Sequence, residues 1–287
     1  MIRRRAALRL GAAAALASSP SQAQKAPRIV SVGSSLTEII YALGAESLLV
    51  GVDSTSLYPD AARSLPQVGY VRALSAEGVL ALRPTLILAT TAAGPRATLD
   101  QLGATGIDVM ILPDHYDYES VVNKIAAVGK VTGRSQEADV LIARGRADMQ
   151  ALAAKLSAAS SKPRVLFLLS MGGGAPQAAG RDTAADGIIR LAGGFNAIDG
   201  YSGYRPLTPE AVIASRADFV LVTRQTVEAM GGVPAILDQP ALSRTPAGRA
   251  GKVLQFDTLL LLGFGPRTPQ AATALAAALH PELARAP

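Results

Sequence analysis

Residues 74–88 read LSAEGVLALRPTLIL, and residues 207–221 read LTPEAVIASRADFVL. Each stretch has a hydroxyl residue suited to a helix N-cap, a glutamate in the first turn, a short apolar helix, a basic residue and then a strand. The two glutamates, Glu77 and Glu210, occupy the same position in the two stretches. A match of this length indicates an internal duplication, and it predicts two lobes built on one plan.

Strands and helices alternate on both sides of each repeat. β-branched apolar stretches bounded by glycine or polar residues indicate strands. Ser35 and Glu38 have the spacing of a capping box ahead of the first helix, and Gly44 ends that helix. The expected strands are 28–32, 48–52, 85–89, 108–112, 164–169, 219–222 and 253–256, and helical stretches are expected at 35–43, 96–102, 120–128, 187–194 and 267–279. This order predicts an α/β fold with two Rossmann-like lobes, each built on a mostly parallel sheet.

One long helix is expected between the lobes. Over residues 135–159 apolar side chains recur at steps of three and four between charges, and Gly145 is the single glycine. A helix of about 25 residues spans roughly 37 Å and is stiff, so the lobes should open and close only slightly. The predicted division is an N-terminal lobe over 24–133, a connecting helix over 134–160 and a C-terminal lobe over 161–287.

The N-terminus has the layout of a secretory signal peptide. Residues 1–9 hold four arginines and no acid, residues 10–17 are apolar or small, and residues 21–23 place small residues before a cut after Ala23. The run that begins at Arg4 also resembles a twin-arginine signal. We therefore expect residues 1–23 to be a signal peptide for the Sec or twin-arginine route, with the periplasm as destination; the alternative is an uncleaved anchor.

Composition excludes several classes of protein. The 28 Lys and Arg against 22 Asp and Glu give a formal charge of +6, which falls to 24 − 22 = +2 without the four arginines of the signal. So small a charge provides no electrostatic footprint for nucleic acid. The chain has no cysteine, which excludes disulfide frameworks, zinc ribbons and iron–sulfur clusters. No apolar run reaches the 18 or so residues of a membrane-spanning helix.

Two segments and the two-lobed plan together resemble a known family. Residues 68–78 read VGYVRALSAEG, and residues 169–180 read LSMGGGAPQAAG. An exported chain with these features resembles the helical-backbone periplasmic binding proteins of ABC importers, whose cargoes are cobalamin, ferric siderophores and haem. The first segment is similar to the one that holds the iron-binding tyrosine of haem carriers, and the second to their matching loop. The resemblance covers residues 28–279 and implies a ligand cleft between the lobes with haem b as the transported ligand.

Tyr70 is the expected iron ligand. A phenolate is a hard anionic donor that suits ferric iron, and tyrosine is an established axial ligand of haem. Ionising a tyrosine side chain at pH 7 costs roughly 4 kcal/mol, of which a bound metal supplies much. Arg72, two residues further on, is expected to support the phenolate or to pair with a propionate.

The second lobe is expected to line the other face of the haem. Some haem carriers have a histidine after the serine of the second segment, but this chain has Met171, whose thioether is a poor ligand for ferric iron. We therefore expect five-coordinate iron, with Tyr70 as its one protein ligand. His115 and His280 are poor substitutes, one in a loop and one in the C-terminal tail. The expected haem-binding residues of this lobe are Met171, Gly172, Gly173, Tyr201, Tyr204 and Arg224.

The resemblance also implies a docking role for the paired glutamates. In such carriers an acid of each lobe meets arginines on one of two permease subunits, and Glu77 and Glu210 occupy matching positions here. Each also suits the dipole of its own helix, which is the plainer interpretation. We expect a monomeric carrier that docks on the permease dimer of an ABC importer and that is not an enzyme.

Rival cargoes and a rival class remain open in the sequence. A ferric siderophore or cobalamin fits the same fold, although the absence of tryptophan weakens cobalamin. An enzyme acting on a tetrapyrrole is a further alternative. However, Ser170 lacks the flanking glycines of a hydrolase elbow, and the glycines of 172–174 lack the Gly-Lys-Ser/Thr of a phosphate loop.

Overall fold

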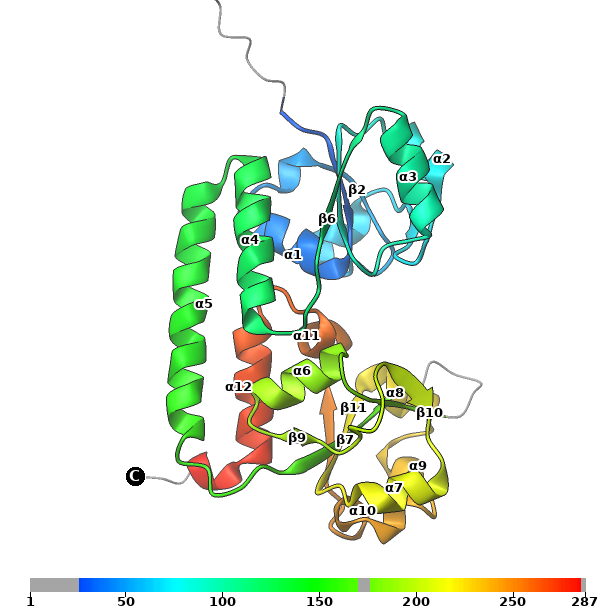
Figure 1. Ribbon diagram of the computed structural model, residues 1–287, viewed down its shortest axis with the longest axis vertical. Coiled ribbons are helices and arrows are strands. Elements are labelled where there is room, and N and C mark those ends of the chain that lie inside the picture. Colours follow the sequence, from blue (N-terminus) through cyan, green and yellow to red (C-terminus); the bar gives the residue numbers. More distant parts are fainter. Residues whose placement is uncertain (1–25, 170–175, 285–287) are drawn as a thin grey trace, which may run out of the picture.

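The computed structural model describes residues 26–169 and 176–284. Two α/β lobes lie one above the other, and a long helix, α5, runs beside both (Figure 1). The N-terminal lobe runs from β1 to α4, and the C-terminal lobe from β7 to α12. The expected signal peptide, 1–23, lies outside the described residues. Within the described ranges, no helix combines the length and the hydropathy needed to cross a membrane.

The sheet of the N-terminal lobe is parallel throughout, in the order β2-β1-β5-β6. Its strands are β1 (Ile29–Val32), β2 (Leu49–Val52), β5 (Leu86–Thr90) and β6 (Asp108–Leu112). The other elements are α1 (Ser34–Ala42), α2 (Ala76–Ala81), α3 (Arg96–Ala104), α4 (Tyr118–Thr132), the hairpin of β3 (Gly69–Tyr70) and β4 (Ala73–Leu74), and the 3-10 turns η1 (Glu46–Leu48) and η2 (Asp60–Ser64). Helices α1 and α4 pack on one face of the sheet and α2 and α3 on the other. Covered faces explain why these strands are almost wholly apolar.

The sheet of the C-terminal lobe is mixed, in the order β10-β8-β7-β11-β12, with β9 also paired to β7. Its strands are β7 (Arg164–Leu169), β8 (Gln177–Ala179), β9 (Phe195–Asn196), β10 (Tyr204–Pro206), β11 (Phe219–Thr223) and β12 (Val253–Phe256). Its helices are α6 (Ala184–Leu191), α7 (Pro209–Ser215), α8 (Arg224–Ala229), α9 (Val233–Leu237), α10 (Pro246–Arg249), α11 (Thr258–Leu262) and α12 (Thr268–Leu279), with the 3-10 turns η3 (Leu242–Arg244) and η4 (Pro281–Ala284). Strands β7, β11 and β12 are parallel, whereas β8 and β10 are antiparallel.

The repeated segments adopt the same local structure. Helices α2 and α7 are each capped by a side chain, since Ser75 accepts from the backbone N–H of Gly78 and Thr208 from that of Ala211. Each helix is followed by an arginine in the left-handed conformation, Arg83 at φ 48° and Arg216 at φ 47°. The two arginines occupy equivalent positions of the repeat, as the two glutamates do. The duplication therefore extends to an unusual backbone conformation.

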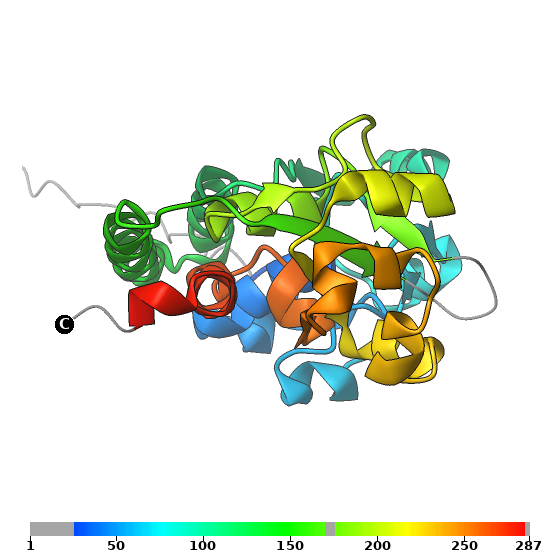
Figure 2. The same cartoon turned by 90° about the horizontal axis from the view of Figure 1, so that it is seen from below.

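The two lobes share part of their hydrophobic core. The connecting helix α5 (Ser135–Leu156) has 22 residues, three fewer than the 25 or so that were expected. It lies beside α4 of one lobe and α12 of the other, which Figure 2 shows in a view along the helices. One cluster of buried residues continues from Leu36 and Ile125 of the N-terminal lobe to Phe167 and Leu275 of the C-terminal lobe. Because separating the lobes would expose part of this cluster, the joint between them is stiffer than a single helix would make it.

The start of α1 differs from the expected capping box. The helix begins at Ser34, with Gly33 as its N-cap and no side-chain cap. The N–H of Gly33 donates to the buried carboxylate of Asp53 at 2.8 Å. Glu38, the expected partner of Ser35, instead accepts hydrogen bonds from Arg267 of the other lobe. A partner 229 residues away in the sequence therefore replaces the local one.

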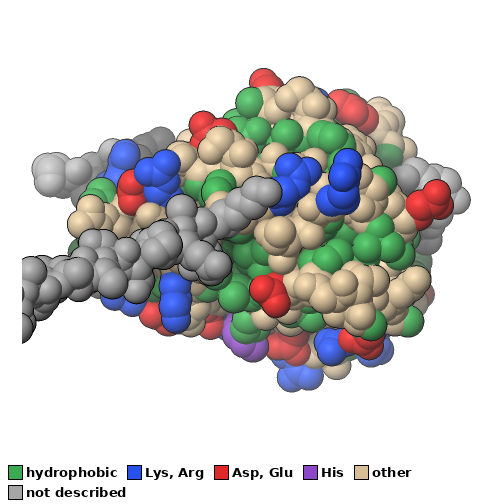
Figure 3. Space-filling view, turned by 90° about the horizontal axis from the view of Figure 1, so that it is seen from above, with side chains coloured by type: hydrophobic (Ala, Val, Ile, Leu, Met, Phe, Trp, Pro, Cys, Tyr) green, Lys and Arg blue, Asp and Glu red, His purple; other side chains and the backbone are tan. Residues whose placement is uncertain are grey.

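Charge on the outer face of the N-terminal lobe is mixed. Seen from above, basic and acidic side chains are scattered among hydrophobic ones, and neither sign dominates the described part of this face (Figure 3). This mixture agrees with the small net charge that remains when the arginines of the expected signal peptide are left out.

Candidate ligand-binding site

Tyr70 lies on a short β-hairpin formed by β3 and β4. Strands β3 and β4 pair Gly69 with Leu74 and Tyr70 with Ala73, so only two residues form the turn between them. Leu74 points into the lobe and is buried, whereas Tyr70 points outward and is 45% exposed. The hairpin thus presents a phenol at the surface above an apolar anchor.

The hairpin is tied to the loops that follow strands β2 and β5. Gly69 accepts a hydrogen bond from the N–H of Ser54 at 2.9 Å, and Gly94 both donates to Val71 and accepts from Leu74. Gly69 itself has φ +104°, and a Cβ there would lie 2.7 Å from the carbonyl oxygen of Ala73. These loops lie at the carboxyl ends of parallel strands, the edge where α/β sheets bind ligands. The sequence and the fold therefore hold Tyr70 in a defined place at this edge.

Arg72, in the turn of the same hairpin, acts on a tyrosine of each lobe. Burial raises the pKa of Tyr116, which follows β6, the carboxylate of Asp114 adds to that shift, and the charge of Arg72 partly opposes it. Burial likewise raises the pKa of Tyr204, which begins β10, and the charge of Arg72 weakly opposes that shift as well. The ring of Tyr116 meets that of Phe264 in the second lobe edge to face, with 5.4 Å between centroids, so the two lobes are in contact at this tyrosine.

Tyr204 is the most buried of the tyrosines predicted to contact the ligand. Burial raises its pKa to about 12, the charge of Tyr116 adds to this shift, and the Ala185 amide and Thr183 hydroxyl oppose it. Its ring meets that of Phe167 edge to face, with 6.4 Å between centroids. The phenol of Tyr204 is therefore held neutral by its surroundings.

Tyr201 is held by contacts within its own lobe. Its hydroxyl donates to the carbonyl oxygen of Ala178 at 3.1 Å, and the guanidinium of Arg205 lies 4.9 Å from the centre of its ring. Burial raises the pKa of Tyr201, and Arg205 partly opposes that shift. One ring face of Tyr201 is thus already covered by a cation.

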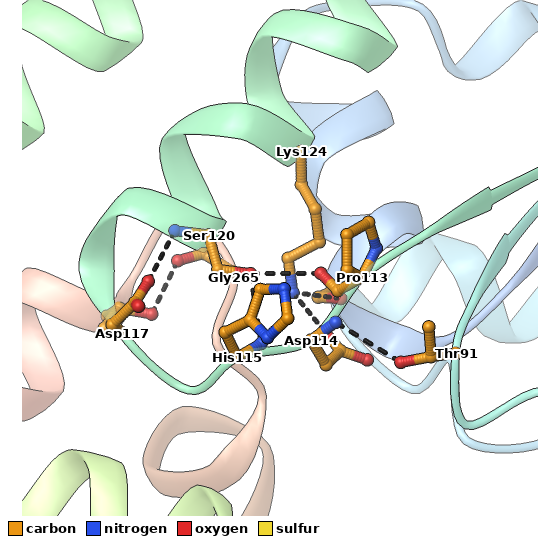
Figure 4. Close-up of polar contacts among 10 residues, drawn as sticks. Thr91, Pro113, Asp114, His115, Asp117, Ser120, Lys124 and Gly265 are labelled. Atoms are coloured by element: carbon orange, nitrogen blue, oxygen red, sulfur yellow. Dashed lines mark hydrogen bonds and ion pairs between the residues drawn. The ribbon is translucent and has the colours of Figure 1, made fainter.

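A buried lysine, which was not among the predicted site residues, fixes the loop between β6 and α4. The Nζ of Lys124 lies 2.6 Å from Asp114 and 3.4 Å from the hydroxyl of Ser35, and only 1% of the Lys124 side chain is exposed (Figure 4). In the same loop the N–H of His115 donates to Ser120, while His115 itself is exposed. A lysine on the apolar face of an amphipathic helix was the signal that could have revealed this pair.

Arg224 lies at the carboxyl edge of the second sheet. It is exposed and begins α8, directly after Thr223 ends β11. The neighbouring strand β7 ends at Leu169. Met171, Gly172 and Gly173, which are predicted to line the haem, lie outside the described part of the chain.

The paired glutamates lie on matching surface helices. Glu77 and Glu210 are exposed in the first turns of α2 and α7, whose N-caps are already filled by Ser75 and Thr208. Neither glutamate forms an ion pair with another described residue. His280, in contrast, is fully buried at the end of α12, away from these surfaces.

Comparison with known proteins places this architecture in a family. A family model described as "Periplasmic binding protein" matches residues 29–258. The structure of the periplasmic heme-binding protein RhuT from Roseiflexus sp. RS-1, in apo form, is similar with a TM-score of 0.85 and 42% identity over 90% of this chain and 99% of that chain.

Two curated relatives match as well. The uncharacterized ABC transporter substrate-binding lipoprotein YvrC of Bacillus subtilis is 27% identical over 89% of this chain and 80% of its own length. The vitamin B12-binding protein of Yersinia pestis is 42% identical over 96 residues, which are 33% of this chain and 34% of that protein. The family match spans both lobes and the helix between them, so the chain belongs to the periplasmic binding protein family.

Proposed function

We propose that this protein binds ferric haem between its lobes and delivers it to an ABC importer. The observation that carries the proposal is Tyr70, an exposed phenol on a hairpin held at the ligand-binding edge of the first sheet. The 42% identity to RhuT, over nearly the whole of that heme-binding protein, favours haem over the other cargoes of the fold.

Tyr70 would bind the iron through its phenolate oxygen. The hydrogen bonds of Gly69 and Gly94 hold the hairpin backbone, so little conformational freedom is lost when the ligand binds. Arg72 lies two residues away and adds a positive charge beside the iron-bound oxygen and the propionates of the haem. An exposed arginine beside a carboxylate gives a charge-assisted hydrogen bond.

The second lobe would cover the opposite face of the haem. Arg224 at the end of β11 is expected to reach the tyrosinate or a propionate, and the backbone of Gly172 and Gly173 to lie against the porphyrin. Tyr204 and Tyr201 would border the macrocycle with their rings. Met171 would contact the haem without ligating ferric iron, which leaves one protein ligand.

The cargo would pass to a permease that docks on the short helices α2 and α7. Glu77 and Glu210 are exposed, have no ion-pair partner in the described chain and are related by the duplication, so they fit two equivalent basic sites on a permease dimer. YvrC, similar over most of this chain, is named as an ABC transporter substrate-binding protein. A monomeric carrier exported by the signal peptide 1–23, with no catalytic step of its own, completes the proposed role.

Cobalamin is the second candidate because of the match to a vitamin B12-binding protein over a third of the chain. Equilibrium dialysis of the mature protein against ferric haem, cyanocobalamin and a ferric siderophore separates the candidates. We expect saturable binding of at least one haem per protein, and no binding of cyanocobalamin or the ferric siderophore at the same concentration. Retention of cyanocobalamin with no retention of haem would contradict the proposal.

A further inference from the structure

One ion pair joins the two lobes directly. Both oxygens of the Glu38 carboxylate, on α1, accept from the guanidinium of Arg267, which precedes α12: Nε at 3.0 Å and Nη2 at 2.8 Å. The backbone N–H of Arg267 donates to the same carboxylate at 3.2 Å. Of the ion pairs formed by described residues, this is the only one that links the N-terminal lobe to the C-terminal lobe.

The contact between Glu38 and Arg267 fixes the relative orientation of the two side chains as well as the distance between them. Its two side chains are only 10% and 23% exposed, and a planar guanidinium that meets both carboxylate oxygens tolerates little rotation. Tyr58 covers the guanidinium, with its ring centre 3.4 Å from the Cζ of Arg267. Gly265, two residues before Arg267, packs so closely that a Cβ there would lie 3.3 Å from Glu38. Four groups from both lobes therefore converge in one fixed arrangement.

The same segment that supplies Tyr58 also holds the Tyr70 hairpin. Tyr58 lies between β2 and β3, and at the start of this segment Ser54 donates to Gly69 of the hairpin. The position of Arg267 is in turn fixed at the start of α12, which packs on α5 and α6. A change in the angle between the lobes therefore distorts the contact of Arg267 with Glu38 and Tyr58 first, and through the segment of Tyr58 it then displaces the hairpin.

We propose that Glu38, Arg267 and Tyr58 form an interlobe latch that sets the angle between the lobes, and with it the position of Tyr70 relative to the second lobe. The three are positioning residues and do not touch the cargo. The latch must rotate or open when a permease spreads the lobes, so it governs how fast the cargo leaves. Its effect on cargo rests on the proposed function, whereas its effect on the lobe angle does not.

The lobe angle is measured without any ligand. The chain has no cysteine, so Ala97→Cys on α3 and Ala214→Cys on α7, both exposed, accept one spin label in each lobe. Double electron–electron resonance of the apo protein should give a narrow distance distribution. Glu38→Gln and Arg267→Lys should broaden it or shift it to longer distances, since neither can form the charged two-pronged contact. Glu119→Gln, which removes an ion pair between α4 and α5, should leave it unchanged.

Haem loss to an excess of apomyoglobin provides the second readout. Coupling energies between sites commonly correspond to 5- to 150-fold changes, and we expect Glu38→Gln to release haem about tenfold faster while Glu119→Gln releases it at the wild-type rate. Distance distributions of Glu38→Gln and Arg267→Lys that superimpose on wild type would overturn the latch. A broadened distribution with unchanged haem loss would overturn its link to the cargo. If wild type binds no haem, the proposed function fails, and the distance distributions still decide whether the latch exists. If Glu38→Gln does not fold, Arg267→Lys, which keeps a cation in place, is the one variant used for both measurements.

Discussion

Gly69→Ala tests whether the hairpin geometry is needed to present Tyr70. Gly69 has φ +104°, a conformation that costs a residue with a side chain about 1–3 kcal/mol. The new Cβ would also lie 2.7 Å from the carbonyl oxygen of Ala73 and 3.3 Å from the amide nitrogen of Ser75, so β3 must move away from β4. For a protein of this size we expect the thermal midpoint to fall by roughly 3–10 °C.

Because Tyr70 follows directly, its phenol moves with the backbone, and haem affinity should fall by about tenfold, or about 1.4 kcal/mol. Calorimetry and a haem titration of the same preparation measure the two effects. Gly44→Ala is the matched control: Gly44 is also left-handed, at φ +64°, but has no atom within 4 Å of a Cβ. It should lose about 1–2 kcal/mol of stability with haem affinity unchanged. A Gly69→Ala protein with wild-type midpoint and affinity would show that the hairpin geometry is not needed to present Tyr70.

Three further predictions concern other contacts. Lys124→Met leaves the largely buried Asp114, whose side chain is 12% exposed, without its partner and should lower the free energy of unfolding in urea by about 3 kcal/mol. Part of the loss should be recovered when Asp114→Asn is added, and a double variant no more stable than the single one would argue against the pair. Burial raises the pKa of Tyr204 to about 12, so its neutral phenol should contribute stability that is present below pH 10 and lost as the pH rises through 12. Across that window, urea titrations should show wild type losing up to about 3 kcal/mol more than Tyr204→Phe. Equal losses would show that another group titrates. Glu77→Ala combined with Glu210→Ala should reduce stimulation of permease ATPase in liposomes about tenfold while haem binding is retained, and undiminished stimulation would place the docking surface elsewhere.

Most of the fold could be predicted because its signals are local. Strands such as Asp108–Leu112 and Arg164–Leu169 were predicted to the residue, since each is an apolar run bounded by polar residues or glycine. The repeat around Glu77 and Glu210 predicted two lobes, and the matching arginines at φ 48° and 47° confirm its extent. The Tyr70 hairpin was not predicted because strands of two residues are too short to show a period.

Contacts between distant parts of the chain were beyond the sequence. Ser35 and Glu38 have the spacing of a capping box, yet Glu38 binds Arg267, because two hydrogen bonds from a cationic guanidinium to both carboxylate oxygens outweigh a single one from a backbone N–H. Asp114 lies in a loop and Lys124 lies ten residues further on, in α4. The sequence does not show that this lysine is buried, because its burial depends on how α4 packs in the folded lobe. Site residues recognised by resemblance, such as Tyr70, needed the fold to show which edge they occupy.

Whether Tyr70 binds the iron of ferric haem is tested by a haem titration of wild type, Tyr70→Phe and Tyr58→Phe, followed by absorbance. Tyr58 is a fair control because it is 42% exposed against 45% for Tyr70, and phenylalanine keeps its ring on Arg267. We predict a saturable Soret change with high-spin charge-transfer bands in wild type and Tyr58→Phe, and loss of those bands in Tyr70→Phe. Identical spectra for Tyr70→Phe and wild type would show that another group holds the iron, and no saturable change in wild type would show that haem is not the cargo.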